Sequence, residues 1–199
     1  MRLVHFAGFV GSGKTSVIHS LSEDHEFCFI ANNKESADEL KDVCPHVDDF
    51  PFKSPCARIR QYRFRFDMML ENDPKVIITE PPGNCLDVSS PMLNPIYVKD
   101  RDKIELGPLI TVFSGRDLLS KGISKRTTDG LRAYNMIDES DVIILTFSDG
   151  LSEDEKNSLV SEISSINEDA KIIFFSKDSI KEISEAVFGN MTYRRPLVY

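Results

Sequence analysis

Short apolar runs alternate with segments of helical spacing along most of this 199-residue chain. Each run is short enough for a buried strand, and the segments between them carry apolar residues three and four positions apart. The pattern predicts strands at 2–7, 26–31, 75–79, 109–113, 141–146 and 171–175. It predicts helices at 14–21, 37–43, 57–71, 127–136, 153–166 and 179–188. Residues 43–55 hold three prolines, and we expect them to form a loop.

Two of these helices carry additional local signals. Glu155 follows Ser152 at the spacing of a capping box, which predicts that a helix begins at residue 153. In the segment 57–71, one face at helical spacing is apolar, and it consists of Ile59, Tyr62, Phe66, Met69 and Leu70. We therefore expect that face to pack on the core.

The alternation of buried strands with helices predicts an α/β fold with a mostly parallel sheet and helices on both faces. The sequence shows no internal repeat, low-complexity tract or linker. We expect residues 1–199 to form a single domain.

Composition and charge narrow the class of protein. Hydrophobic residues make up 41% of the chain and charged residues 28%, which is typical of a soluble globular protein and excludes a disordered one. No apolar run approaches the ~20 residues of a membrane span, and the N-terminus lacks a signal-peptide cleavage site. We therefore expect a cytoplasmic protein with no membrane partner. The net charge of −8 argues against nucleic-acid binding.

The segment from Gly8 to Thr15 reads GFVGSGKT and fits the phosphate-binding pattern G-x-x-x-x-G-K-[ST] completely. It follows a predicted strand and opens a predicted helix, as that chemistry requires. We expect the backbone around Gly8, Gly11, Ser12, Gly13 and Ser16 to bind phosphates. Lys14 is expected to reach the β- and γ-phosphates, and the Thr15 hydroxyl to bind Mg²⁺. Because Lys14 lies in a loop, we expect its removal to spare the fold.

A second nucleotide signal follows the strand 75–79. Glu80 ends that strand and Gly83 comes three residues later. This is the spacing at which P-loop GTPases place an acid that holds Mg²⁺ and a glycine that senses the γ-phosphate. We expect Glu80 to bind Mg²⁺ or orient the attacking water.

The chain resembles the metal-centre accessory GTPases, which comprise the CobW family and the hydrogenase and urease accessory G proteins. The resemblance rests on GFVGSGKT, on the T-E-P-P-G that begins at Thr79, and on 139–155, which is similar to the family's strand and base-reading loop. It implies a P-loop fold, GTP with Mg²⁺, a client metalloprotein and a homodimer. The additional C-terminal domain of CobW proteins has no counterpart before residue 199.

The base-reading segment departs from the family pattern. The family's N-K-x-D is Thr146, Phe147, Ser148 and Asp149 here. Asp149 retains the carboxylate that accepts from guanine, Thr146 replaces the asparagine, and the Phe147 ring could stack where the lysine stem covers the base. We expect GTP to be preferred, with ATP as the alternative.

The candidate ligands for a transition metal are scattered between the phosphate loop and the segment after Glu80. Cys44 and His46 flank Pro45, which resembles the Cys-Pro-His motif of the urease accessory protein. Cys56 is the one cysteine kept from the family's C-x-C-C, and Cys85 follows Gly83. Thiolate and imidazole suit Zn²⁺, Ni²⁺ or Co²⁺. The alternative is that all four are ordinary core or loop residues.

We therefore expect a Mg²⁺-dependent nucleotide triphosphatase, a GTPase of the metal-assembly type. Two alternatives stay open. One is a P-loop kinase of small molecules or nucleotides, although its only arginine cluster, 58–65, lies in a predicted helix. The other is a module that holds nucleotide with little hydrolysis, which the altered segment 146–149 favours.

Overall fold

The structure is a computed structural model that describes residues 1–50, 58–81 and 93–194. Within these ranges, seven strands form one all-parallel sheet in the order β3-β2-β4-β1-β5-β6-β7. The strands are β1 (Arg2–Ala7), β2 (Cys28–Ala31), β3 (His46–Asp49), β4 (Val76–Thr79), β5 (Glu105–Ser114), β6 (Val142–Thr146) and β7 (Lys171–Phe174). The expected α/β class with a parallel sheet is confirmed.

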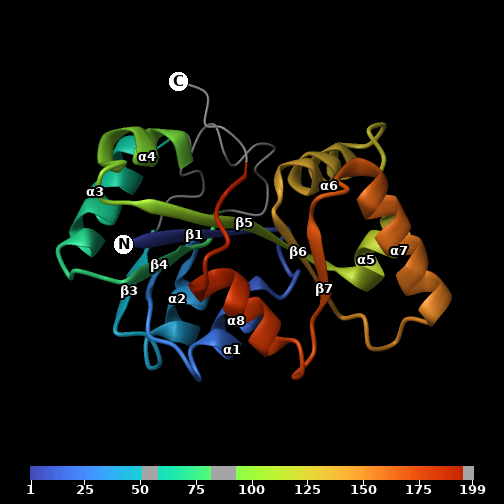
Figure 1. The fold of residues 1–199 in the computed structure, drawn as a ribbon, viewed down its shortest axis with the longest axis horizontal. Helices are drawn as coiled ribbons and strands as arrows, with labels where there is room; N and C mark the ends of the chain where they lie inside the picture. The colour runs from blue at the N-terminus through green and yellow to red at the C-terminus, as the bar shows by residue number, and fades with distance from the viewer. Residues whose placement is uncertain (51–57, 82–92, 195–199) are drawn as a thin grey trace.

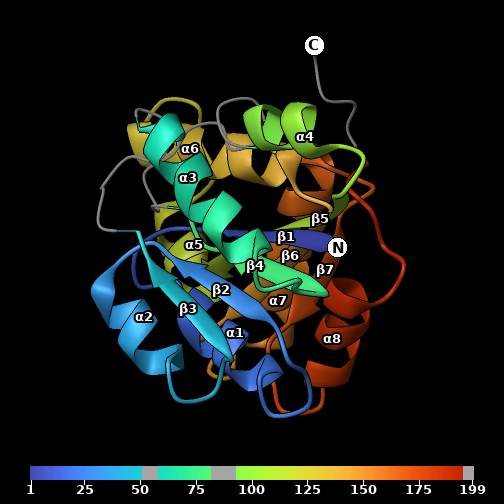
Figure 2. The ribbon, with the colours of Figure 1, turned by 90° about the vertical axis from the view of Figure 1, so that its left-hand side faces the viewer.

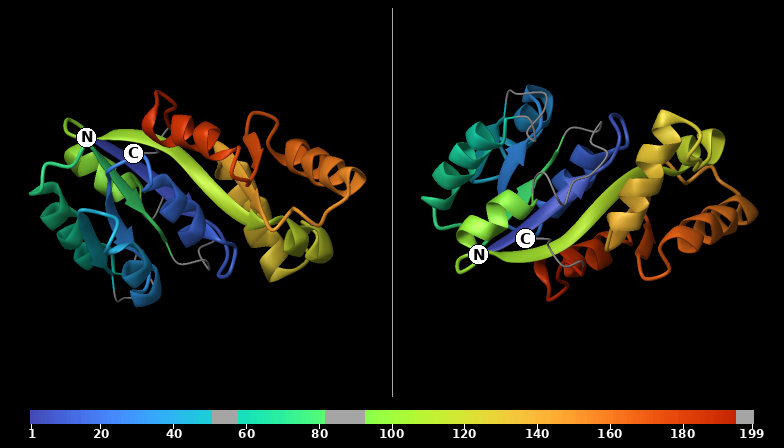
Figure 3. Two further views of the ribbon diagram at one scale, coloured as in Figure 1. Left: turned by 90° about the horizontal axis from the view of Figure 1, so that it is seen from below. Right: turned by 90° about the horizontal axis from the view of Figure 1, so that it is seen from above.

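Helices cover both faces of the sheet, as Figure 1 shows from the side and Figure 3 from below and above. One face carries α1 (Lys14–Leu21), α2 (Lys34–Leu40) and α8 (Ile180–Phe188). The other carries α3 (Ile59–Leu70), α4 (Asn94–Asp100), α5 (Gly115–Lys121), α6 (Thr128–Glu139) and α7 (Glu153–Ile166). None of the helices in the described ranges is long and apolar enough to cross a membrane.

The core divides into one large cluster beneath α1, α2 and α8 and two clusters on the opposite face. On that opposite face, α3 and α4 cover the β2–β4 side of the sheet (Figure 2), and α5, α6 and α7 pack on the β5–β7 side. Alternate residues of β1 supply both faces: Val4 and Phe6 face α1, whereas Leu3 faces α3. This alternation is what a buried parallel strand requires.

Local signals in the sequence predicted several elements correctly. Helix α7 begins with the expected capping box, in which the Ser152 hydroxyl accepts from the Glu155 N–H and the Glu155 carboxylate accepts from the Ser152 N–H. Helix α3 buries Tyr62, Phe66 and Met69 against the sheet, and Ile59 and Leu70 pack partly buried beside them. The apolar face expected from helical spacing is therefore the face that packs.

Three elements differ from the prediction. The segment expected to be a loop contains β3, an edge strand whose residues read HVDD and are only partly buried. The sequence of β3 is polar and therefore lacks the apolar run by which strands were predicted. Pairing with β2 holds this strand in place. Helices α4 and α5 were also missed, although Pro95 lies in the first turn of α4 and the Ser114 hydroxyl caps α5 by accepting from the Asp117 N–H.

Strand β5 is longer than predicted because it contains a bulge. Its pairing with β1 shifts by one residue between Leu3 and His5, opposite Gly107 and Pro108. Proline cannot donate to the ladder, and an extra residue at that point lets the strand continue. A Cβ at Gly107 would lie 2.7 Å from a methyl carbon of Val4. The Gly-Pro pair therefore marks a bulge inside the strand and not its beginning.

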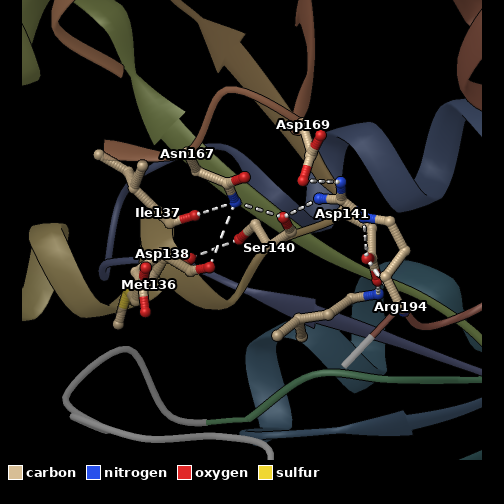
Figure 4. Close-up of polar contacts among 9 residues, drawn as sticks. Met136, Ile137, Asp138, Ser140, Asp141, Asn167, Asp169 and Arg194 are labelled. Atoms are coloured by element: carbon tan, nitrogen blue, oxygen red, sulfur yellow. Dashed lines mark hydrogen bonds and ion pairs between the residues drawn. The ribbon is translucent and has the colours of Figure 1, made fainter. Parts of the chain in front are cut away.

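The C-terminal segment returns to the sheet and is tied to the start of β6 (Figure 4). The Asp141 carboxylate accepts from the N–H of Leu109 and from both the N–H and the guanidinium of Arg194. The same guanidinium donates to the carbonyl of Ser140 and lies 3.4 Å from Asp169. The Asn167 amide closes the end of α6 by donating to the carbonyl oxygens of Ile137, Asp138 and Ser140.

We predict that Asp141→Asn lowers the free energy of unfolding by about 2 kcal/mol, because hydrogen bonds to a buried charged group are worth more than neutral ones. Asp169→Asn is the matched control. It removes an exposed carboxylate from the same arginine, and we expect a loss below about 0.5 kcal/mol. Urea unfolding of both variants measures the difference, and equal losses would contradict the assignment of Asp141 as the buried anchor.

Burial in the middle of β1 strongly affects the pKa of His5. The imidazole is 2% exposed and contacts the Thr79 hydroxyl, and desolvation lowers its pKa to about 3. The folded protein therefore keeps His5 neutral at pH values where the unfolded chain binds a proton, so acid favours unfolding.

We predict that His5→Gln reduces the loss of stability in acid. Below pH 6.5 the wild type loses stability through His5, and by pH 5 this amounts to about 2 kcal/mol. Urea unfolding at pH 7 and pH 5 tests this: the gap between wild type and variant should change by that amount in favour of the variant. A gap that does not change with pH would show that His5 does not titrate in this way.

Candidate functional site

The segment between β1 and α1 forms a tight loop at the carboxyl edge of the sheet. Gly8, Gly11 and Gly13 have φ angles of 138°, 77° and 84°, which L-residues rarely adopt. Among the residues that the structure describes, no side chain caps α1, whose N-cap residue is Gly13. The N–H groups of its first turn are therefore available to a ligand at the positive end of the helix dipole.

Close approach of the backbone explains two of these glycines. A Cβ at Gly8 would lie 2.2 Å from the carbonyl oxygen of Val112 in β5. A Cβ at Gly13 would lie 3.3 Å from a methyl carbon of Thr146 and 3.5 Å from the Phe147 ring. Gly11 has open space around it, so only its backbone conformation requires glycine.

Lys14 lies inside the loop and is buried. Its ammonium donates to the carbonyl oxygens of Gly8 and Phe9, at 3.1 and 2.9 Å, and lies 3.5 Å from the Glu80 carboxylate. Burial lowers the pKa of Lys14, and the attraction of Glu80 opposes that shift. The expectation that Lys14 is a loop residue outside the packed structure is wrong, because the side chain turns inward and is 5% exposed.

Glu80 and Ser36 complete the polar centre. Glu80 follows β4 and is buried, and burial raises the pKa of its carboxyl against the opposing effects of Lys14 and of a hydrogen bond from Ser36. One carboxylate oxygen of Glu80 has no hydrogen-bond partner in the described part of the chain. The Thr15 hydroxyl lies 3.1 Å from the Ser36 hydroxyl, which places Thr15, Ser36 and Glu80 together.

A cavity of about 280 Å³ opens over this centre. Its lining includes Val10, Gly11 and the residues from Gly13 to Ser16, the segment that follows β2, and Glu80 and Phe147. Loop glycines, a buried ammonium and free N–H groups suit a phosphate chain. Thr15 and the unpartnered Glu80 oxygen suit Mg²⁺, which usually takes one or two carboxylates together with substrate phosphates. The residues present therefore fit both groups.

The segment after β6 contacts the phosphate loop directly. The Thr146 hydroxyl donates to the Ser12 carbonyl at 2.7 Å, so Thr146 holds the loop from behind. Phe147 has a φ angle of 50°, is 53% exposed and lines the cavity beside Gly13. Asp149 is exposed, and it does not belong to the described lining of the phosphate cavity.

The structure does not bring Cys44 and His46 to this centre. Both lie at the amino end of β3, whereas the phosphate loop lies at the carboxyl end of β1 in the same parallel sheet. Cys44 is buried in the core, and desolvation raises the pKa of its thiol to about 12, which opposes metal binding. Within the described ranges, no three His, Cys, Asp or Glu side chains could hold a metal ion. Gly83, Cys56 and Cys85 lie outside the described residues.

The segment after β2 supplies residues that the sequence analysis missed. Ser36 is buried at the start of α2, where its N–H donates to the Asn33 side chain. Asn32, Glu35 and Glu39 line the cavity with it. Strand β2 pairs with β4, so its carboxyl end lies next to Glu80. The signal that could have found these residues is the order of strands, because ligands bind where the carboxyl ends of parallel strands meet.

Comparison with known proteins shows similarity to solved structures. No family model and no curated protein matches the sequence. The structure of HypB from Helicobacter pylori in complex with nickel matches with a TM-score of 0.65 at 18% identity, covering 92% of this chain and 83% of that one. The hydrogenase maturation factor HypB from Archaeoglobus fulgidus matches with a TM-score of 0.64 at 16% identity, covering 95% and 89%.

A Zn(II)-bound triple mutant of the YjiA GTPase matches with a TM-score of 0.58 at 13% identity, over 89% of this chain but only 58% of that one. The chain has the fold of P-loop GTPases. The expected resemblance to metal-related members of that class is therefore confirmed in the fold, over most of the chain.

We predict that Gly8→Ala is more damaging than Gly11→Ala. Both replace a glycine of positive φ, which costs about 1–2 kcal/mol of stability, but only the Gly8 side chain meets a backbone atom. Gly8→Ala should lower the unfolding temperature further and abolish binding of a nucleoside triphosphate. Thermal unfolding and calorimetric titration measure the two effects. Equal behaviour of the two variants would show that the contact with Val112 does not constrain the loop.

Proposed function

We propose that this protein is a Mg²⁺-dependent GTPase in which nucleotide binding and hydrolysis depend on the Lys14–Glu80 centre. The supporting observation is that a buried ammonium, a buried carboxylate with an unpartnered oxygen, and two hydroxyl groups meet beside a glycine loop at a helix N-terminus. A triphosphate and a divalent cation together supply the partners that these groups lack.

Each residue then has a defined role. Lys14, which donates to two loop carbonyls in this structure, turns its ammonium to the β- and γ-phosphates. Thr15 and Glu80 hold Mg²⁺, which neutralises phosphate charge when it is bound. Glu80 lies beside Lys14, at the edge of the site where the γ-phosphate is expected, and there it can also orient the attacking water. Such sites act by positioning and electrostatics, so we expect slow intrinsic hydrolysis.

Guanine preference is the finer part of the proposal. Thr146 ties the base-reading segment to the phosphate loop through Ser12, so the base and the phosphates are held in a common frame. The exposed Phe147 ring lies next to Gly13 and offers an apolar face to a base. The Asp149 carboxylate then accepts from the guanine N–H groups, which adenine does not offer.

We predict that Lys14→Met lowers the affinity for GTP at least a hundredfold, because it removes the cation nearest the phosphates. The substitution also leaves Glu80 buried without a cation, which destabilises the protein. Lys14→Met with Glu80→Gln is the control that removes both charges and should recover stability without recovering binding. Calorimetry on both, with unfolding curves, separates the two effects. Unchanged GTP affinity in folded Lys14→Met would refute the proposed site.

We predict that Asp149→Ala removes most of the preference for GTP over ATP, worth roughly 1–3 kcal/mol by analogy with other bidentate base contacts. Asp154→Ala, at an exposed position in the first turn of α7, is the matched control and should leave the preference unchanged. Competition between GTP and ATP measures the ratio, and phosphate release by the wild type distinguishes a GTPase from a protein that only holds nucleotide. ATP competing as well as GTP in the wild type would exclude guanine recognition.

The last part of the proposed function is a role in metal-centre assembly, with a client metalloprotein and a homodimer. This part rests on resemblance. Two of the similar structures contain nickel and Zn(II), and these metals belong to those proteins. Here Cys44 and His46 do not fit a nucleotide-coupled metal site, so this role would depend on Cys56 and Cys85. Titration of Zn²⁺, Ni²⁺ or Co²⁺ into wild type and a Cys56→Ser, Cys85→Ser variant tests it. Equal weak binding in both would leave the nucleotidase alone.

A further inference from the structure

A second cavity, of about 470 Å³, lies on the other side of the phosphate loop from the nucleotide site. Its walls are the carboxyl end of β5, helix α5, the first half of α6 and the loop residues Phe9, Val10 and Ser12. Val10 lines both cavities and is 87% exposed. None of the roles assigned above to the phosphate site uses this second cavity.

Apolar atoms form most of the inner surface. Phe113, Leu118 and Ala133 are almost fully buried from solvent, and the Phe9 ring packs against Phe113 at 5.8 Å between centroids. Volume and lining of this kind are typical of a site for a small organic molecule. The nucleotide site, by contrast, is lined mostly by loop backbone and polar side chains.

The lining of this cavity contains hydrogen-bond donors at Ser12 and in the first turn of α6. Ser12 lines it and is 2% exposed, and its buried hydroxyl has no hydrogen-bond partner among the described residues. The first turn of α6 also lines it, and there the Thr127 side chain accepts from the Gly130 N–H. This cap leaves the preceding N–H groups of that turn to a ligand. A ligand that presents an oxygen acceptor satisfies these groups.

The charged side chains of the lining are paired. Asp117 lies 3.9 Å from Lys121, and Asp129 lies 3.2 Å from Arg132, which is outside the lining. A ligand with a net charge therefore finds no unpaired opposite charge among Asp117, Lys121 and Asp129. The cavity consequently favours an uncharged molecule over a carboxylate or an amine.

We propose that this cavity binds a small, uncharged, largely apolar molecule whose acceptor oxygen is held by Ser12 and the start of α6. Such a ligand contacts Phe9 and Val10, and the carbonyl of Ser12 is the group that Thr146 holds. Binding there is expected to change the conformational freedom of the phosphate loop. The cavity would then regulate the affinity of the loop for nucleotide.

The first experiment uses the full chain without nucleotide and four probes of similar size, observed by protein NMR. Acetophenone carries a neutral acceptor, ethylbenzene lacks it, benzoate is an anion and benzylamine is a cation. We expect acetophenone to bind with a dissociation constant on the order of 1 mM, at least fivefold more tightly than the other three. Equal binding of all four, or preference for a charged probe, would overturn the proposed chemistry.

Two variants test the location. Ala133→Phe fills the cavity and should abolish acetophenone binding, whereas Asn135→Phe, on the same helix but outside the lining, should retain it. Ser12→Ala should weaken acetophenone severalfold and leave ethylbenzene unchanged. If Ala133→Phe fails to fold, the Ser12→Ala comparison decides alone. Acetophenone binding that neither variant affects would place the site elsewhere.

The regulatory part rests on the proposed nucleotide binding and is tested separately. Titration of GDP with and without saturating acetophenone should give affinities that differ by at least twofold. The affinity for acetophenone should change by the same factor when GDP is bound, because coupling is reciprocal. Probe binding with no effect on GDP affinity would remove the regulation but keep the cavity. Failure of GDP to bind at all would refute the proposed function and leave the first experiment intact.

Discussion

The buried pair of Lys14 and Glu80 is the interaction around which the site is arranged. Removing two charges from water is expensive, and a single partner seldom offsets it. Burial lowers the pKa of the lysine and raises that of the glutamate, so each is pushed toward its neutral form. A buried pair of this kind is weak evidence for stability and stronger evidence for a functional site. A phosphate chain with a divalent cation would give each charge a second partner.

The rest of the fold keeps this pair in place. Strand β1 lies between β4 and β5, so Lys14 after β1 and Glu80 after β4 emerge side by side at one edge. The contact of Gly8 with β5 brings the loop onto the sheet, and Thr146 holds it from β6. At the other edge of the sheet, Asp141 ties the C-terminal segment to β5 and β6. Strand β6 is thus tied to its surroundings near both of its ends.

The structure also shows that resemblance to a metal motif does not predict which cysteine or histidine lies near the phosphate loop. Cys44 and His46 resemble a metal motif in sequence, but they begin β3 and therefore face the opposite edge of the sheet from the phosphates. His5 carries no motif, yet it lies in β1, is fully buried and contacts Thr79, the residue before Glu80. Spacing along the chain could not distinguish these cases. The two ends of a four-residue strand lie at opposite edges of the sheet, so residues close in sequence can be far apart there.

The sequence by itself determined the phosphate loop, the acid after β4, the α/β class and the start of α7, where Ser152 and Glu155 form a capping box. These features depend on neighbours within a few residues, such as glycines of positive φ, capping hydroxyl groups and apolar periodicity. Only the tertiary structure decided the rest. Strand β3 forms because β2 pairs with it. Ser36 joins the site because β2 lies beside β4. Lys14 has a buried partner because Glu80 follows β4, which is far from Lys14 in sequence but adjacent to β1 in the sheet. The second cavity likewise forms between segments that meet only when the sheet is complete, so no local pattern could reveal it.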